Sequence, residues 1–270
     1  MTDTSITTET GPLPVYLARP TTTGPWPAVI VIHDALGMSN DLRRQADWLA
    51  GSGYLAVAPD LYRGGHKLRC MFAAIRDIRA RRGRTFDDID TVRTWLANGA
   101  DCAGPIGIIG FCMGGGFVLL LAPTHRYSAA SVNYGTAGKD VLSLDYLGGT
   151  CPIIGSYGAK DRGNRGTAQR LERLLTDLGV DHDIKEYPDA GHSFLNDHDP
   201  ADAPTVFVVL AKLTGQPSMN LRPPTPAEGS PTSSICTSSR PPGNGAKGAG
   251  GASEGVRGTA NTVWDRQDLG

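Results

Sequence analysis

The sequence predicts an α/β fold in which a mostly parallel central sheet is flanked by helices and followed by a disordered C-terminal tail. Short apolar runs alternate with stretches of helical periodicity along most of the chain, as a parallel sheet with crossover helices requires. One of these runs passes straight into a glycine-rich turn and then into an apolar helix. Residues 215–270, in contrast, contain 10 Gly and 7 Pro, a composition typical of disorder.

Apolar or alternating runs predict strands at residues 26–32, 54–58, 129–134, 152–158 and 183–187, and another from residue 105 into the glycine-rich turn. Helical spacing predicts helices at 41–49 after an Asn40 cap, at 86–97 after a Thr85 cap, at 115–122 and at 167–178. A last helix begins at 204–213 and then loses its periodicity. We therefore predict an α/β domain over residues 1–214 and a low-complexity tail over 215–270. We hypothesise that a reading-frame change after residue 213 replaced the final helix; the alternative is that the tail is a genuine linker.

The glycine-rich turn has the pattern of a nucleophile elbow that carries cysteine. Gly110 and Gly114 lie two residues before and two after Cys112, where small residues let the backbone fold back without a side-chain clash. The helix that follows presents its N-terminus to the sulfur and favours a thiolate. The alternative interpretation is a buried cysteine in a tight turn, since free cysteine is among the most buried residue types.

Two later loops supply the partners that such an elbow requires, in the order acid and then histidine. Asp161 ends the loop after the strand at 152–158, and His192 lies on the loop after the strand at 183–187. The carboxyl ends of parallel strands meet at one edge of a sheet, so we expect both side chains near Cys112. Taken singly, Asp161 could be a solvated loop acid and His192 a surface histidine.

This arrangement predicts acyl transfer through a covalent thioester. His192 would take the thiol proton, Asp161 would orient the imidazole, and Cys112 would attack a carbonyl carbon. The oxyanion needs two donors, which we assign to the backbone N–H groups of Met113, directly after the nucleophile, and of Ala35, after the strand at 26–32.

Four segments give the chain a resemblance to the dienelactone hydrolase family of α/β-hydrolases. They are Val31-Ile32-His33-Asp34-Ala35-Leu36-Gly37, Ala58-Pro59-Asp60-Leu61-Tyr62, Gly110-Phe111-Cys112-Met113-Gly114-Gly115 and Gly191-His192-Ser193-Phe194. The resemblance implies an α/β-hydrolase fold and a cofactor-free hydrolase that opens enol-lactones or cleaves small activated esters. It also implies Cys112, Asp161 and His192 as the triad.

The chain departs from this family at two kinds of position. Asp34 stands where the family has a glutamate that meets the nucleophile, so Asp34 is a candidate for a shorter acid in that role. No motif matches the family's substrate-binding arginines. The run Arg76, Arg79, Arg81, Arg82 and Arg84 could supply a guanidinium for a substrate carboxylate, or it could form a solvated helix end.

The composition excludes several other classes of function. The formal net charge is -1 and no aromatic stacking motif accompanies the arginines, so we expect a small-molecule lactone or ester as partner and no nucleic acid. No apolar run approaches membrane-spanning length and the N-terminus is polar, so we expect no membrane association and a cytoplasmic location. The remaining cysteines and histidines lack metal-ligand spacing, and we expect no metal. A second function class keeps the fold and uses Cys112 as a non-catalytic or redox-sensing thiol.

Overall fold

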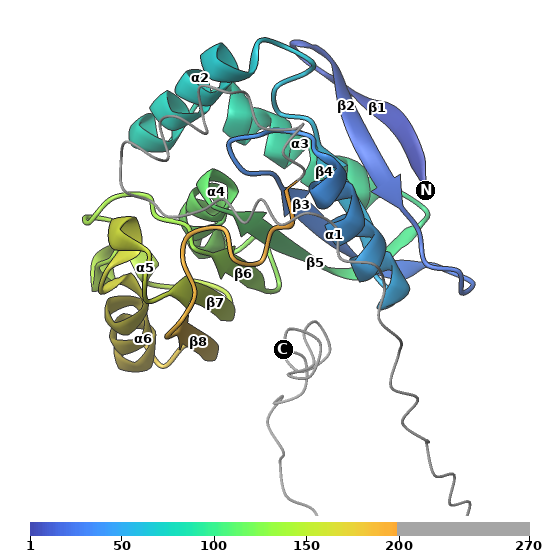
Figure 1. The fold of residues 1–270 in the computed structure, drawn as a ribbon. Helices are drawn as coiled ribbons and strands as arrows, with labels where there is room; N and C mark the ends of the chain where they lie inside the picture. Colours follow the sequence, from blue (N-terminus) through green and yellow to red (C-terminus); the bar gives the residue numbers. More distant parts are fainter. Residues whose placement is uncertain (199–270) are drawn as a thin grey trace, which may run out of the picture.

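The computed structural model describes residues 1–198, which form an α/β domain around one eight-stranded sheet (Figure 1). The strand order across the sheet is β1-β2-β4-β3-β5-β6-β7-β8. The strands from β4 to β8 in this order are parallel, and β1 and β2 join the sheet in antiparallel fashion. The predicted mostly parallel α/β fold is confirmed. The predictions for the helix at 204–213, the tail at 215–270 and the reading-frame change lie outside the described residues.

The elements follow one another in the alternation that the sequence predicts. The strands are β1 (Thr2–Thr8), β2 (Gly11–Ala18), β3 (Trp26–Ile32), β4 (Leu55–Pro59), β5 (Cys102–Phe111), β6 (Ala130–Asn133), β7 (Ile153–Gly158) and β8 (His182–Tyr187). The helices are α1 (Asn40–Gly51), α2 (Lys67–Ala80), α3 (Arg84–Asn98), α4 (Met113–Leu121), α5 (Leu144–Leu147) and α6 (Thr167–Asp177), with 3-10 turns at η1 (Ala122–Thr124) and η2 (Arg162–Asn164).

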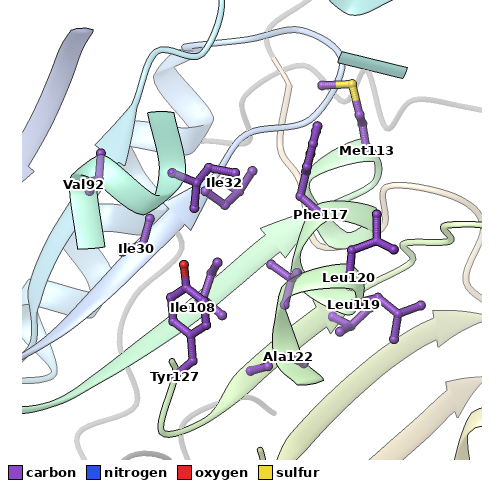
Figure 2. Close-up of a cluster of buried hydrophobic side chains, with 14 of the residues drawn as sticks. Ile30, Ile32, Val92, Ile108, Met113, Phe117, Leu119, Leu120, Ala122 and Tyr127 are labelled. Atoms are coloured by element: carbon purple, nitrogen blue, oxygen red, sulfur yellow. The ribbon is translucent and has the colours of Figure 1, made fainter. Parts of the chain in front are cut away.

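Side chains alternate between the two faces of the sheet and build a core on each. Ile30, Ile32 and Ile108 join the larger core, which Val92 of α3 and Phe117 of α4 complete (Figure 2). The intervening residues of β3 and β5 point to the other face, where helix α1 packs against them. No helix within residues 1–198 is long and apolar enough to cross a membrane.

Four elements and two caps differ from the sequence-based expectation. The hairpin of β1 and β2, helix α2 and the short helix α5 were not among the predicted elements. Strand β1 is mostly polar and exposed, so it lacks the apolar signal of a strand and depends on its pairing with β2. Helix α1 is capped by the side chain of Ser39, which accepts from Leu42 N, and Asn40 is its first residue. Helix α3 starts at Arg84, and the Thr85 hydroxyl donates to Asp77 instead of capping the helix.

Candidate active site

The sheet brings the ends of three parallel strands together at its carboxyl edge, and each strand is followed by one candidate residue. Cys112 comes directly after β5, Asp161 follows β7 by a short loop, and His192 lies on the loop after β8. Because β5, β6, β7 and β8 are consecutive neighbours in the sheet, the cysteine and the histidine loop approach one another across β6 and β7.

The elbow at Cys112 has the backbone conformation that its glycines predict. Cys112 has φ +53° and ψ -114°, in the positive-φ region that residues other than glycine rarely adopt. A Cβ atom on Gly110 would lie 2.4 Å from the backbone of Gly114, and one on Gly114 would lie 2.4 Å from the Ile32 carbonyl oxygen. Only glycine fits at either position, so the turn passes tightly against strand β3 and projects the sulfur beyond the end of the sheet.

The loops that carry the acid and the histidine are joined to each other. Lys160 N donates to the Ala190 carbonyl at 2.9 Å, and Ala159 N donates to the Tyr187 carbonyl at 2.9 Å. Gly158 permits this approach, because a Cβ atom there would lie 2.5 Å from the carbonyl oxygens of Ala190 and Gly191.

The three candidate side chains form one hydrogen-bonded chain. His192 Nε2 lies 3.0 Å from Cys112 Sγ, and His192 Nδ1 lies 2.6 Å from Asp161 Oδ2. The Asp161 side chain is fully buried, whereas the His192 side chain keeps 21% of its surface exposed. The imidazole is therefore the bridge between a buried carboxylate and a sulfur that solvent and small molecules can reach.

The pKa values of the acid and the histidine move in opposite directions. Burial disfavours the imidazolium, but the negative sulfur of Cys112 and the hydrogen bond to Asp161 outweigh it and raise the pKa of His192 to about 10. Burial also opposes the charge of Asp161, yet its hydrogen bond to His192 and those from Asn164 and Gly163 lower the pKa of the carboxyl. The site thus favours a proton on His192 and an ionised carboxylate at Asp161.

Asp161 is held by donors on its own loop. Its Oδ1 accepts from Gly163 N at 2.9 Å, and its Oδ2 accepts from Asn164 Nδ2 at 2.7 Å as well as facing His192. The same amide group of Asn164 donates to the Tyr134 carbonyl at 2.8 Å. Asn164 thereby ties the acid to the end of strand β6.

Met113 and Ala35, the predicted oxyanion donors, both line the cavity beside Cys112. Within the described part of the chain, the backbone N–H groups of these two residues donate no hydrogen bond. The Ala35 loop is fixed from its other side, where the Tyr62 hydroxyl donates to the Ala35 carbonyl at 3.1 Å.

Asp34 directs its carboxylate toward partners other than the sulfur. Its Oδ1 accepts from Leu36 N at 2.7 Å, and its Oδ2 lies 2.8 Å from Nε2 of the buried His198. The neighbouring His33 is fully buried, with Nδ1 2.7 Å from the Asp34 carbonyl and Nε2 accepting from Leu61 N. Burial lowers the pKa of His33 and favours its neutral form. In that form Nδ1 donates to the Asp34 carbonyl and Nε2 accepts from Leu61 N, so both ring nitrogens help to hold the loop.

A cavity of about 460 Å³ opens beside the sulfur. It is lined by Ala35, Met71, Ile75, Ile78, Arg79, Cys112, Met113, Tyr134, Thr136, Ala137, Gly138, Asp161, Gly163, Asn164 and His192. Helix α2 supplies one wall, which is apolar except for Arg79. A volume of this order suits a small organic molecule.

The structure separates the members of the predicted arginine run. Arg76 and Arg81 form ion pairs with Asp77 and Asp140. Arg84 donates to the Leu61 carbonyl at 3.1 Å, and Arg79 lines the cavity. Within residues 1–198, Arg79 has neither an ion-pair partner nor a hydrogen-bond partner.

Sequence reasoning missed the wall formed by α2 and three polar residues around the triad. The apolar spacing of Met71, Ala74 and Ile78 could have revealed the helix, because these residues share one helical face. Asn164, Tyr134 and Asn196 carry no motif, and their roles depend on contacts between distant segments. Among the described residues, no group of three or more His, Cys, Asp or Glu side chains could hold a metal ion.

Comparisons with known proteins point to one family. The sequence pattern of the family described as "Dienelactone hydrolase family" matches residues 13–211. A protein of Yersinia pestis named "Putative carboxymethylenebutenolidase" is 31% identical over 219 residues, which cover 74% of this chain and 80% of the relative. A carboxymethylenebutenolidase of Rhodococcus opacus is 29% identical over 199 residues, which cover 69% of this chain and 77% of the relative.

A solved structure has a similar fold. It is described as "Putative Dienelactone Hydrolase" from Klebsiella pneumoniae, and it superimposes with a TM-score of 0.61 at 27% sequence identity. The match covers 80% of this chain and 98% of that structure.

Proposed function

This chain belongs to the dienelactone hydrolase family and is a hydrolase of the carboxymethylenebutenolidase type, and from that premise we propose that it opens enol-lactones such as dienelactone, or cleaves small activated esters, through a Cys112–His192–Asp161 triad. The observation that carries the proposal is the continuous contact from Sγ through the imidazole to the buried carboxylate, at 3.0 and 2.6 Å.

In the proposed first half-reaction, His192 Nε2 holds the proton of Cys112 and the sulfur attacks the carbonyl carbon of the substrate. The bond between the carbonyl carbon and the ring or ester oxygen then breaks, and His192 returns the proton to the leaving oxygen. The acyl group remains on Sγ as a thioester. Asp161 keeps Nδ1 protonated, so Nε2 is the nitrogen that exchanges the proton.

In the second half-reaction, His192 takes a proton from a water molecule that attacks the thioester carbon. The carbon–sulfur bond breaks, the sulfur leaves as a thiolate beside the imidazolium, and the product departs as a carboxylic acid that releases its proton to solvent. The backbone N–H groups of Met113 and Ala35 are the proposed donors to the oxyanion in both steps. The support for this assignment is that both residues line the cavity and that neither N–H group donates a hydrogen bond within the described residues.

The cavity favours a substrate that is small, largely apolar and negatively charged at one end. Met71, Ile75 and Ile78 offer an apolar wall, and Arg79 adds a guanidinium to the lining on the same helix. A guanidinium without an ion-pair partner can bind a carboxylate in a bidentate manner, which enol-lactones with a carboxymethylidene group would provide.

We also propose that residues 1–214 form the hydrolase unit and that it works in the cytoplasm. The family pattern lies within this range, at residues 13–211. A thiol nucleophile is suited to a reducing compartment, where it stays unoxidised.

Steady-state hydrolysis of a cis-dienelactone and of a short-chain aryl ester tests the proposal, with wild-type, Cys112→Ala and Cys102→Ala proteins compared. Cys102 lies at the far end of β5 from the elbow, so its variant is the matched control and should keep full activity. We expect lactone turnover that Cys112→Ala abolishes. Ester turnover alone would assign a general esterase, and no turnover by a folded, thiol-reactive protein would favour the redox-sensing alternative.

A further inference from the structure

A buried carboxylate outside the triad holds the loop that carries His192. The segment from Pro188 to His198 contains turns but no helix or strand, so its position depends on side-chain contacts. Asp41, in the first turn of α1, supplies such a contact from 155 residues away in the sequence, and its side chain is only 3% exposed.

Asp41 obtains most of its partners from this loop. Its Oδ2 accepts from Asn196 Nδ2 at 2.6 Å, and its Oδ1 accepts from Asp197 N at 3.1 Å. The remaining partner is Arg44, one turn along α1, at 3.3 Å. A buried carboxylate that loses its donors is strongly disfavoured, so the loop must lie in this place for the charge of Asp41 to be accommodated.

Asn196 passes this constraint on to the catalytic histidine through an aromatic ring. Its Oδ1 accepts a hydrogen bond from the Tyr134 hydroxyl. The Tyr134 ring meets the His192 imidazole edge to face, with 5.3 Å between centroids, and packs against Phe194 at 5.6 Å. His192 and Phe194 both belong to the histidine loop, and Phe111 of β5 lies against the same ring at 6.3 Å.

We infer that Asp41 is a positioning residue for the reaction, which acts through Asn196 and Tyr134 to hold the His192 imidazole against Cys112. The inference rests on the proposed function of Cys112. Because the His192 Nε2 to Sγ distance is 3.0 Å, a small shift of the loop would break the proton-transfer contact and lower turnover while substrate binding is retained.

An exchange of the two side chains tests this inference. Asp41→Asn places its amide nitrogen against either Asn196 Nδ2 or Asp197 N, both of which are donors, and Asn196→Asp places two carboxylates in contact, so each single variant disrupts the contacts of residue 41. The double variant restores them, because the amide at 41 donates to the carboxylate at 196, which still accepts from Tyr134. Asp90→Asn is the matched control, since Asp90 pairs with Arg93 and Arg126, neither of which lines the cavity.

We expect each single variant to lose about tenfold in kcat with KM changed by less than about twofold, and to alkylate Cys112 with iodoacetamide about tenfold more slowly at pH 7. The double variant should recover both rates to within about threefold of wild type, and Asp90→Asn should change neither. The pH profile of alkylation is read as well, because the titratable groups facing the imidazole are Cys112, Asp161 and Tyr134, and the exchange of residues 41 and 196 alters none of them. A purely structural role would lower the unfolding midpoint and leave the alkylation profile of the folded protein in place.

Folded single variants with wild-type alkylation and kcat would overturn the inference, and so would a double variant no faster than the singles. If a single variant does not fold, Tyr134→Phe decides, because it removes only the hydroxyl that meets Asn196. Unchanged alkylation and kcat in that variant would overturn the inference too. Rapid alkylation of a wild-type protein that turns over neither substrate would contradict the proposed function and leave the alkylation comparison valid.

Discussion

The Nε2 atom of His192 faces the sulfur of Cys112 at 3.0 Å across 80 residues of sequence. The same ring turns Nδ1 toward a carboxylate that solvent does not reach. Because Asp161 engages Nδ1, Nε2 is the nitrogen that exchanges a proton with the sulfur.

Replacing Asp161 by Asn should lower kcat by about 10⁴-fold while the fold is kept, because an amide no longer fixes the imidazole tautomer. Asp189→Asn is the matched control, since this exposed loop acid contacts only Lys160 among the described residues. Steady-state kinetics of both variants on one substrate decide the outcome. Equal activity in the two variants would remove Asp161 from the mechanism.

The raised pKa of His192 predicts how stability changes in alkaline solution. The unfolded histidine loses its proton near 6.5 and the folded one near 10, so the stabilisation is complete below pH 6.5 and is lost as the pH rises through 10. The free energy of unfolding of wild type relative to His192→Gln, measured in urea at several pH values, should therefore fall across this interval. A difference that stays constant from pH 6 to pH 10 would contradict the raised pKa of His192.

A methyl group at Gly114 should be poorly tolerated. The added Cβ would lie 2.4 Å from the Ile32 carbonyl oxygen and 2.6 Å from that of His33, so the elbow must move. We expect Gly114→Ala to cost about 3 kcal/mol or more of unfolding free energy and to lose activity. Gly51→Ala is the control, because nothing lies within 4 Å of its Cβ position at the end of α1. Chemical denaturation of both variants measures the contrast, and a mild Gly114→Ala would show that the elbow can adjust.

Arg79 should discriminate between charged and neutral substrates. We expect Arg79→Met to raise KM for a carboxylate-bearing lactone by about tenfold and to leave KM for an uncharged aryl ester nearly unchanged. Arg82→Met removes a nearby arginine that does not line the cavity, so it should leave both values as they are. An equal rise in KM for the two substrates would mean that Arg79 contributes to the shape of the cavity and does not bind the substrate carboxylate.

The parts of the molecule that follow from local sequence were predictable. The elbow is one of these, because its glycines and the apolar runs beside them impose one backbone path within a few residues. The contacts of His192 with Cys112 and with Asp161 could also be anticipated, since the carboxyl ends of parallel strands converge in a known order.

The rest depends on which distant side chains meet. The direction of the Asp34 carboxylate is set by His198, far along the chain, and no pattern near Asp34 announces that partner. The polar strand β1 likewise becomes a strand only through its pairing with β2. The residues that make contacts of this kind show no periodicity and match no motif, so the contacts become visible only in the folded structure.

The positive φ of Cys112 sets stability and activity against each other at one position. A residue other than glycine in this sparsely populated conformation costs roughly 1 to 3 kcal/mol. A glycine at 112 would relieve that cost and give a sturdier protein with no sulfur to react. Efforts to make this enzyme more heat-resistant should therefore leave the elbow alone and seek their gains elsewhere, because this strained residue is the nucleophile of the proposed reaction.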